Sequence, residues 1–171
     1  MVNLAPDEKT TLVMLYTNNA LIRGEVVTKE SARVGVWLRT QGVPNLIHII
    51  KPNIILFGGS PPKTLTYSEM YVPTVTVIGF HPAPPNNDPL DYDENEKNRS
   101  MEPISILMGT FIVKGSIRIA TTANISTSLD VAYNGWISIY NAEITNPFLP
   151  QMPPMLVPML LASPSRISFI K

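Results

Sequence analysis

The residues best suited to bind a metal lie in one acidic stretch, DYDENEKNRSME. Four oxygen-bearing side chains occupy positions 1, 3, 5 and 12 of an EF-hand-like loop: Asp91, Asp93, Asn95 and Glu102. Ca²⁺ takes oxygen ligands at alternating positions and a bidentate carboxylate at the end of such a loop. However, position 6 is Glu96 rather than the glycine of the sharp turn, and Pro89 and Pro103 disfavour flanking helices. Calcium binding therefore stands as an alternative to a solvated acidic spacer.

A second group of side chains has the chemistry to bind a nucleic acid. Basic residues around an aromatic ring can hold a phosphate backbone and stack a base. The alternation in ARVGVWLRT predicts a strand with its basic and aromatic side chains on one face. With residues expected on neighbouring strands, the candidates are Arg23, Arg33, Trp37, Arg39 and Lys51. A similar segment later in the chain has Asn124, Ser126, Ser128 and Asp130 there. A nucleic-acid surface and an ordinary solvated face with one half-buried Trp both remain open.

The groups that most enzymes use are sparse. The chain has two histidines, His48 and His81, and no cysteine, which excludes disulfides, thiolate metal sites and cysteine nucleophiles. The carboxylates outside the acidic stretch are isolated in sequence, and FGGS (57–60) lacks the lysine of a phosphate loop. Neither GxSxG nor HExxH occurs. We expect a protein without catalytic residues and without a cofactor.

Composition indicates a folded chain rich in extended segments. The hydrophobic fraction is 44%, charged residues make up 15%, and seventeen prolines stand against nine glycines. The net charge is zero, whereas a dedicated nucleic-acid-binding domain is usually strongly basic. The first ten residues lack the basic and apolar parts of a signal peptide, and no apolar run reaches the roughly 20 residues of a spanning helix. We expect a cytoplasmic protein without a membrane span.

Two parts of the chain are similar to each other. LIHIIKPNI (46–54) matches WISIYNAEI (136–144) at an offset of 90 residues, and earlier segments match at an offset of 91. The matches include Val13 with Ile104, Leu15 with Ile106, Arg23-Gly24 with Lys114-Gly115, Val72-Pro73 with Val157-Pro158, and Ile78-x-Phe80 with Ile167-x-Phe169. Because their order never breaks, we interpret them as an internal duplication.

Each copy is predicted to form about five short strands. TLVMLYTNNALIRGEVV has the pattern of a hairpin that turns at Asn18-Asn19, and both ARVGVWLRT and ANISTSL alternate as strands do. Ile47 and Ile49 share a face, but Ile54 has the opposite parity, and the second copy shows the same slip. A β-bulge near Pro52 and Ala142 would return the later isoleucine to the apolar face. Sheets this small usually curl into barrels that hide their edges.

The pattern LIRGEVV…ARVGVWL…LIHIIKPNIILF resembles the Sm-like small β-barrel, in which five bent strands close on themselves. The chain also resembles uncharacterised bacterial proteins whose repeat carries a segment like WISIYNAEI. The Sm-like resemblance implies ring-like association through edge strands. It implies no RNA-binding residue, because TQGVPNL and AYNGW stand where the family has its Asp-x-Met-Asn-type signature.

We therefore expect an all-β protein of two tandem five-stranded Sm-like barrels, related by internal duplication. The first spans residues 1–81, an acidic proline-bounded linker spans 82–103, and the second spans 104–171. The second barrel carries a Met/Pro-rich stretch with six apolar candidates for an association arm: Phe148, Leu149, Met152, Met155, Leu156 and Met159. This stretch is either an exposed arm or a cover of the core.

The leading functional hypothesis is a noncatalytic scaffold that assembles with copies of itself or with a partner protein through strand edges and this arm. A nucleic-acid-binding module that uses the Arg/Trp face is the alternative, and a calcium-dependent binding protein is the third.

Overall fold

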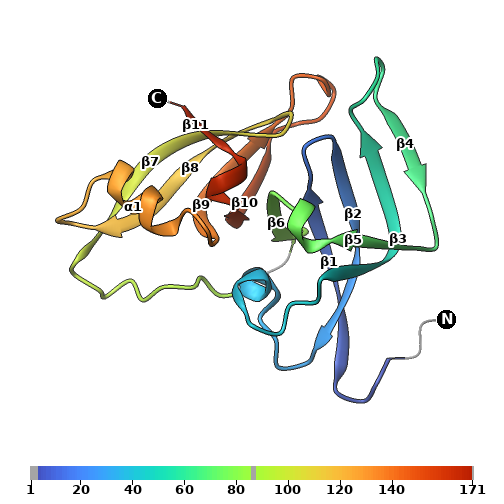
Figure 1. Ribbon diagram of the computed structural model, residues 1–171, viewed down its shortest axis with the longest axis horizontal. Coiled ribbons are helices and arrows are strands. Elements are labelled where there is room, and N and C mark those ends of the chain that lie inside the picture. The colour runs from blue at the N-terminus through green and yellow to red at the C-terminus, as the bar shows by residue number, and fades with distance from the viewer. Residues whose placement is uncertain (1–3, 86–87, 171) are drawn as a thin grey trace.

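A computed structural model describes residues 4–85 and 88–170 of the chain, which form an all-β protein. Within these ranges eleven strands join into one antiparallel sheet (Figure 1). The strands are β1 (Glu8–Tyr16), β2 (Ala20–Lys29), β3 (Leu46–Leu56), β4 (Lys63–Thr66), β5 (Glu69–Pro73), β6 (Gly79–Pro82), β7 (Arg99–Met108), β8 (Phe111–Ala120), β9 (Ile137–Thr145), β10 (Met155–Ala162) and β11 (Ser168–Ile170).

The order of strands in the sheet is β11-β7-β8-β9-β10-β6-β1-β2-β3-β4, and β5 pairs with β3 beside β4. β6 pairs with β1 on one side and with β10 on the other. The expectation of two closed barrels is wrong, since the sheet is open. The edge of β6 that could have closed a barrel of β1–β6 pairs instead with β10, so the two parts of the chain share one sheet (Figure 1).

We call residues 4–82 the first half and residues 99–170 the second half. In the sheet the first half has the order β6-β1-β2-β3, with β4 and β5 both paired to β3, and the second half has the order β11-β7-β8-β9-β10. β4 and β5 take along β3 the place that the single strand β10 takes along β9. Equivalent strands pair in equivalent registers: Tyr16 lies opposite Gly79, and Leu107 lies opposite Ser168. The register also corrects one match made from sequence, which paired Val72 with Val157. Val72 lies opposite Ile47, and Ala162 lies opposite the matching Ile137, so the counterpart of Val72 is Ala162.

The predicted bulges are confirmed at equivalent positions in both halves. Between β2 and β3 the register shifts opposite Arg23–Glu25, and between β8 and β9 it shifts opposite Lys114–Ser116. The inserted residues include Lys51 and Asn141, both at φ 49°. After each bulge the later isoleucine returns to the interior, and Ile54 and Ile144 are 4% and 0% exposed.

The expectation that ARVGVWLRT and ANISTSL form strands is wrong. Val34–Arg39 is a 3-10 helix, and Ile125–Ala132 is the α-helix α1. The Asn124 side chain caps α1 by accepting a hydrogen bond from the backbone N–H of Thr127 at 2.8 Å. Ile125 and Leu129, four residues apart, pack against the core, and an i, i+4 spacing satisfies strand alternation as well as a helical face.

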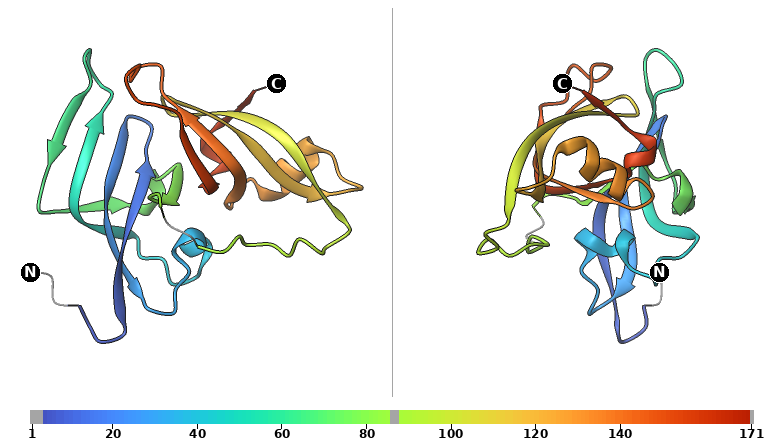
Figure 2. Two further views of the ribbon diagram at one scale, coloured as in Figure 1. Left: turned by 180° about the vertical axis from the view of Figure 1, so that it is seen from behind. Right: turned by 60° about the vertical axis from the view of Figure 1, so that its left-hand side comes forward.

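The sheet is curved in both halves (Figure 2). Two apolar clusters form the core, one in each half. The first-half cluster includes Val13, Leu15, Ile49 and Phe80, together with Leu161 from β10. The second-half cluster includes Ile106, Phe111 and Ile144, together with four residues of the first half: Met14, Tyr16, Leu21 and Ile78. Each core is therefore completed by side chains from the other half.

Between the halves, β7 begins at Arg99, inside the segment 82–103 that was predicted to be a linker. We call residues 88–98 the acidic segment. Among the described residues, no helix has the length and apolar character needed to cross a membrane.

Candidate functional site

Asp91 lies at the centre of a polar network that ties the two halves together. Its carboxylate pairs with the guanidinium of Arg39, at the end of the 3-10 helix of the first half. It also accepts hydrogen bonds from two hydroxyls of β9 in the second half, those of Ser138 (2.7 Å) and Tyr140 (2.5 Å). Arg39 also donates to Ser138 Oγ of β9 (2.8 Å) and to the carbonyl of Trp136, just before β9 (3.2 Å). The Asp91 side chain is only 10% exposed. Because these contacts connect the first half to the second, we call the group of Arg39, Asp91, Ser138 and Tyr140 the clasp.

The electrostatics of this clasp favour a charged Asp91. Burial raises the pKa of Asp91, but the hydrogen bonds from Tyr140 and Ser138 and the charge of Arg39 outweigh it and leave the pKa below its usual value. Burial and the hydrogen bond to Asp91 raise the pKa of Tyr140, so the phenol stays a neutral donor. The group is stable as an ion pair with two hydroxyl donors, which suits a structural contact.

Other residues of the acidic segment are anchored as well. Arg118 on β8 donates to Glu96 Oε2 at 2.7 Å and to the carbonyl of Asp93 at 2.8 Å. Its guanidinium also lies 4.4 Å from the centre of the Tyr92 ring. The segment is therefore held against the protein, which the prediction of a solvated spacer did not anticipate.

The structure spreads the four calcium candidates along this segment and into a strand. Asp91 belongs to the clasp, Asp93 accepts from the backbone N–H of Asn95 at 2.8 Å in a local turn, and Glu102 lies in β7 opposite Ile117. Within residues 4–85 and 88–170, no group of three or more His, Cys, Asp or Glu side chains is arranged to hold a metal ion.

The nucleic-acid candidates do not form one exposed face. Trp37 is 9% exposed and packs in the first-half core, so its ring faces away from solvent. Arg33 donates to the carbonyls of Pro89 (2.7 Å) and Leu90 (3.0 Å), and Arg39 belongs to the clasp. Arg23 is exposed on β2, and Lys51 is exposed at the bulge of β3. The predicted alternation of Arg33, Trp37 and Arg39 along one strand is wrong, because residues Val34–Arg39 form a 3-10 helix.

The Met/Pro-rich stretch divides between core and surface. Met152 and Met155 pack against the second-half cluster, Leu149 is partly buried, and Met159 is 7% exposed. Phe148 and Leu156 are 62% and 69% exposed. The stretch is thus mostly a loop and the strand β10, and two of its six candidate association residues are exposed.

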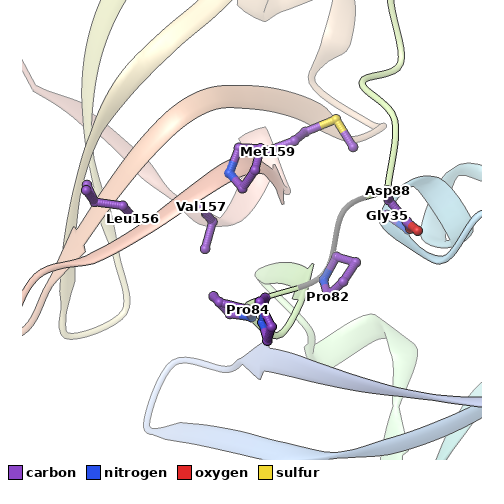
Figure 3. A pocket seen from close by; sticks show the side chains of 9 residues that line it. Gly35, Pro82, Pro84, Asp88, Leu156, Val157 and Met159 are labelled. Atoms are coloured by element: carbon purple, nitrogen blue, oxygen red, sulfur yellow. The ribbon is translucent and has the colours of Figure 1, made fainter.

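A cavity of about 210 Å³ lies where the halves meet, between β10 and the segment that follows β6 (Figure 3). Its wall is largely apolar, with proline rings and the side chains of Leu156, Val157 and Met159. The polar side chain there, Asp88, accepts a hydrogen bond from the backbone N–H of Gly35 at 3.0 Å.

A buried histidine lies between the halves, and no pattern in the sequence gave it a role. His81 on β6 is fully buried. Its Nδ1 lies 2.8 Å from the carbonyl of Pro82, and its Nε2 lies 2.9 Å from the hydroxyl of Tyr16. Because a carbonyl can only accept, Nδ1 carries the proton and Nε2 accepts from Tyr16. Burial lowers the pKa of His81 to about 4, so the ring is neutral.

The two ends of the sheet expose strand edges with apolar side chains beside them. At one end, β4 and β5 have β3 as their one partner within the described residues, and Tyr67, Tyr71 and Val75 are 57%, 58% and 68% exposed. At the other end, β11 pairs with β7 and with no other strand of the part that the structure describes, and Leu107 and Ile170 are 44% and 39% exposed. Unpaired N–H and C=O groups on such edges are templates for pairing with another chain. These edges are the surfaces that best fit a binding role.

Comparisons of the chain with protein-family models, with curated proteins and with solved structures gave no match.

Proposed function

We propose that the protein is a noncatalytic scaffold that associates with copies of itself through the two open edges of its sheet. The observation that carries this proposal is the exposure of apolar side chains beside both edges, Tyr71 at β5 and Ile170 at β11. Edge strands of monomeric proteins are usually shielded by charges, prolines or covering segments. Here the edges keep large apolar groups in solvent, which a partner strand would bury.

Two related proposals concern origin and relationship. We infer that the halves arose by duplication of one unit, on the basis of their equal strand order, their equivalent bulges and Lys51 and Asn141 at the same φ. The order β6-β1-β2-β3, with β5 paired to β3, also supports the proposed resemblance to Sm-like proteins.

Nucleic-acid binding is a less favourable proposal for this geometry. Stacking a base needs an exposed ring, and Trp37 is buried. Arg33 and Arg39 are occupied by groups of the acidic segment.

The proposal is tested by placing a charge on one edge. Tyr71→Lys puts an ammonium on β5, where a pairing strand would have to desolvate it, and we expect the mass of the assembly to fall to that of the monomer. Val131→Lys is the matched control, because Val131 is an 85% exposed apolar residue of α1, away from both edges. If both variants kept the mass of the parent assembly, the strand edges would not be the contact.

A further inference from the structure

The contact between β6 and β10 is an example, inside the chain, of two edges meeting. Leu161 lies opposite Phe80, and Ala162 lies opposite Gly79. The second half thereby covers the outer face of the first half, where Tyr16, Leu21 and His81 are 0%, 4% and 0% exposed. Tyr16 and Leu21 become part of the second-half core.

The same face of the second half has no such cover. Tyr16 lies opposite both Leu21 and Gly79, just as Leu107 lies opposite both Ile112 and Ser168. Leu107 is thus the counterpart of Tyr16, and it is 44% exposed where Tyr16 is fully buried. Ile170, the counterpart of His81, is 39% exposed. One surface therefore occurs twice, covered in the first half and uncovered in the second.

The receiving side is also present twice. In the second half, Phe111, Ile144 and Leu160 belong to the core cluster that takes in Tyr16 and Leu21. Their counterparts in the first half line an open cavity of about 420 Å³: Ala20, Ile54 and Met70. At its rim Tyr71 is 58% exposed, whereas its counterpart Leu161 is fully buried in the β6–β10 contact. The first half therefore has an open apolar cavity at the place that corresponds to where the second half takes in Tyr16 and Leu21.

Where β6 and β7 come closest in the contact between the halves, the counterpart residues have sizes that would allow the same contact between two copies of the chain. Gly79 faces Met108, and a Cβ added to Gly79 would lie 2.2 Å from the Met108 sulfur. The counterpart of Gly79 is Ser168, which is larger, and the counterpart of Met108 is Thr17, which is smaller. Thr17 lines the open cavity, so a larger residue on one side meets a smaller one on the other.

We propose that copies of the chain join head to tail by repeating the β6–β10 contact. β11 of one copy pairs with β5 of the next, with Phe169 opposite Tyr71 and Ser168 opposite Val72, and Leu107 and Ile112 enter the first-half cavity of the next copy. This rests on the proposed self-association and specifies its partner, register and direction. Such a heterologous contact gives a ring if the rotation closes and a filament if it does not.

A pair of engineered cysteines tests the register, since the chain has no cysteine of its own. The N–H of Ser163 donates to the carbonyl of Ile78 at 3.0 Å, so the adjacent Ala162–Gly79 pair is of the non-hydrogen-bonded type. Cα atoms of such pairs lie about 4.5 Å apart, within the range that a disulfide spans. The equivalent pair between copies is Val72 and Ser168, and both tolerate cysteine by size. For the full-length double variant Val72→Cys with Ser168→Cys, oxidation is expected to give a covalent ladder of dimers, trimers and larger products.

Controls separate this inference from the proposed function. Each single variant should give no ladder, and Thr66→Cys with Ser168→Cys, out of register on the same edge, should give none. Covalent dimers from Val72→Cys alone would mean that like edges meet, which overturns the head-to-tail contact but keeps self-association. Absence of a ladder from an associated double variant overturns the register, and a monomeric parent overturns both. As a second readout, Leu107→Arg should dissociate the assembly to 18.9 kDa chains, and an unchanged mass would exclude the cavity as the receptor.

Discussion

Acid should destabilise the protein through His81. The ring is buried between the halves, and both of its nitrogens are satisfied only in the neutral Nδ1–H form. A second proton on Nε2 would point at the hydroxyl of Tyr16, which would have to give up its role as donor. Burial also raises the pKa of Tyr16, so the phenol cannot supply a compensating negative charge.

The size of the effect follows from the pKa shift. Burial lowers the pKa of His81 from 6.5 to about 4, so between these values the unfolded chain binds more protons than the folded one. The stability associated with the neutral His81 ring is therefore fully present above pH 6.5, and this part of the free energy of unfolding is lost as the pH falls towards 4. Since one pKa unit corresponds to about 1.4 kcal/mol, a loss of about 2 kcal/mol is expected at pH 5 and about 3 kcal/mol below pH 4.

The assay is urea unfolding of the protein and of His81→Gln from pH 7 to pH 4. The free energy of unfolding of the parent should fall more steeply with decreasing pH, and the difference between the two curves isolates the histidine. With only two histidines in the chain, NMR titration of the His81 ring, identified with a His48→Gln variant, gives an independent value. Parallel curves for the two proteins, or a ring that titrates near 6.5, would refute the reasoning.

Three further outcomes can be checked by denaturation and by mass. Gly115→Ala should lower the free energy of unfolding by about 1 to 3 kcal/mol, because the added Cβ would lie 2.7 Å from a backbone oxygen of β9. Gly135→Ala, whose added Cβ would have its nearest contact at 3.6 Å, should be close to neutral in the same urea unfolding. Asp91→Ala should lower the free energy of unfolding by about 2 kcal/mol through loss of the clasp, while Asp93→Ala, which removes a local turn contact, should cost less than half of that. Leu156→Arg should leave the assembly mass unchanged in light scattering, since this exposed residue lies outside the proposed contact.

Local patterns predicted the local features of this fold. The parity slip at Ile54 and Ile144 located both bulges, because alternation is a property of neighbouring residues. The same reasoning failed for α1, since Ile125 and Leu129 fit a strand and a helix equally well. The cap at Asn124 was the signal that could have decided between them.

Long-range features were not predictable in this way. The sheet is open because Phe80 pairs with Leu161, and no local pattern shows which edge β6 will choose. The clasp likewise joins Asp91 to Arg39 and Tyr140, which are far apart in sequence. The sequence offered Asp91 only as a candidate calcium ligand or as part of a solvated spacer. The strand predicted for its segment left Trp37 either half-buried or exposed for stacking, whereas the 3-10 helix places the ring in the core.

The most direct test of self-association through sheet edges is the mass of the unmodified chain, measured by light scattering at micromolar concentration. The account predicts an assembly whose mass is a multiple of 18.9 kDa. A mass of 18.9 kDa that does not change with concentration would contradict it.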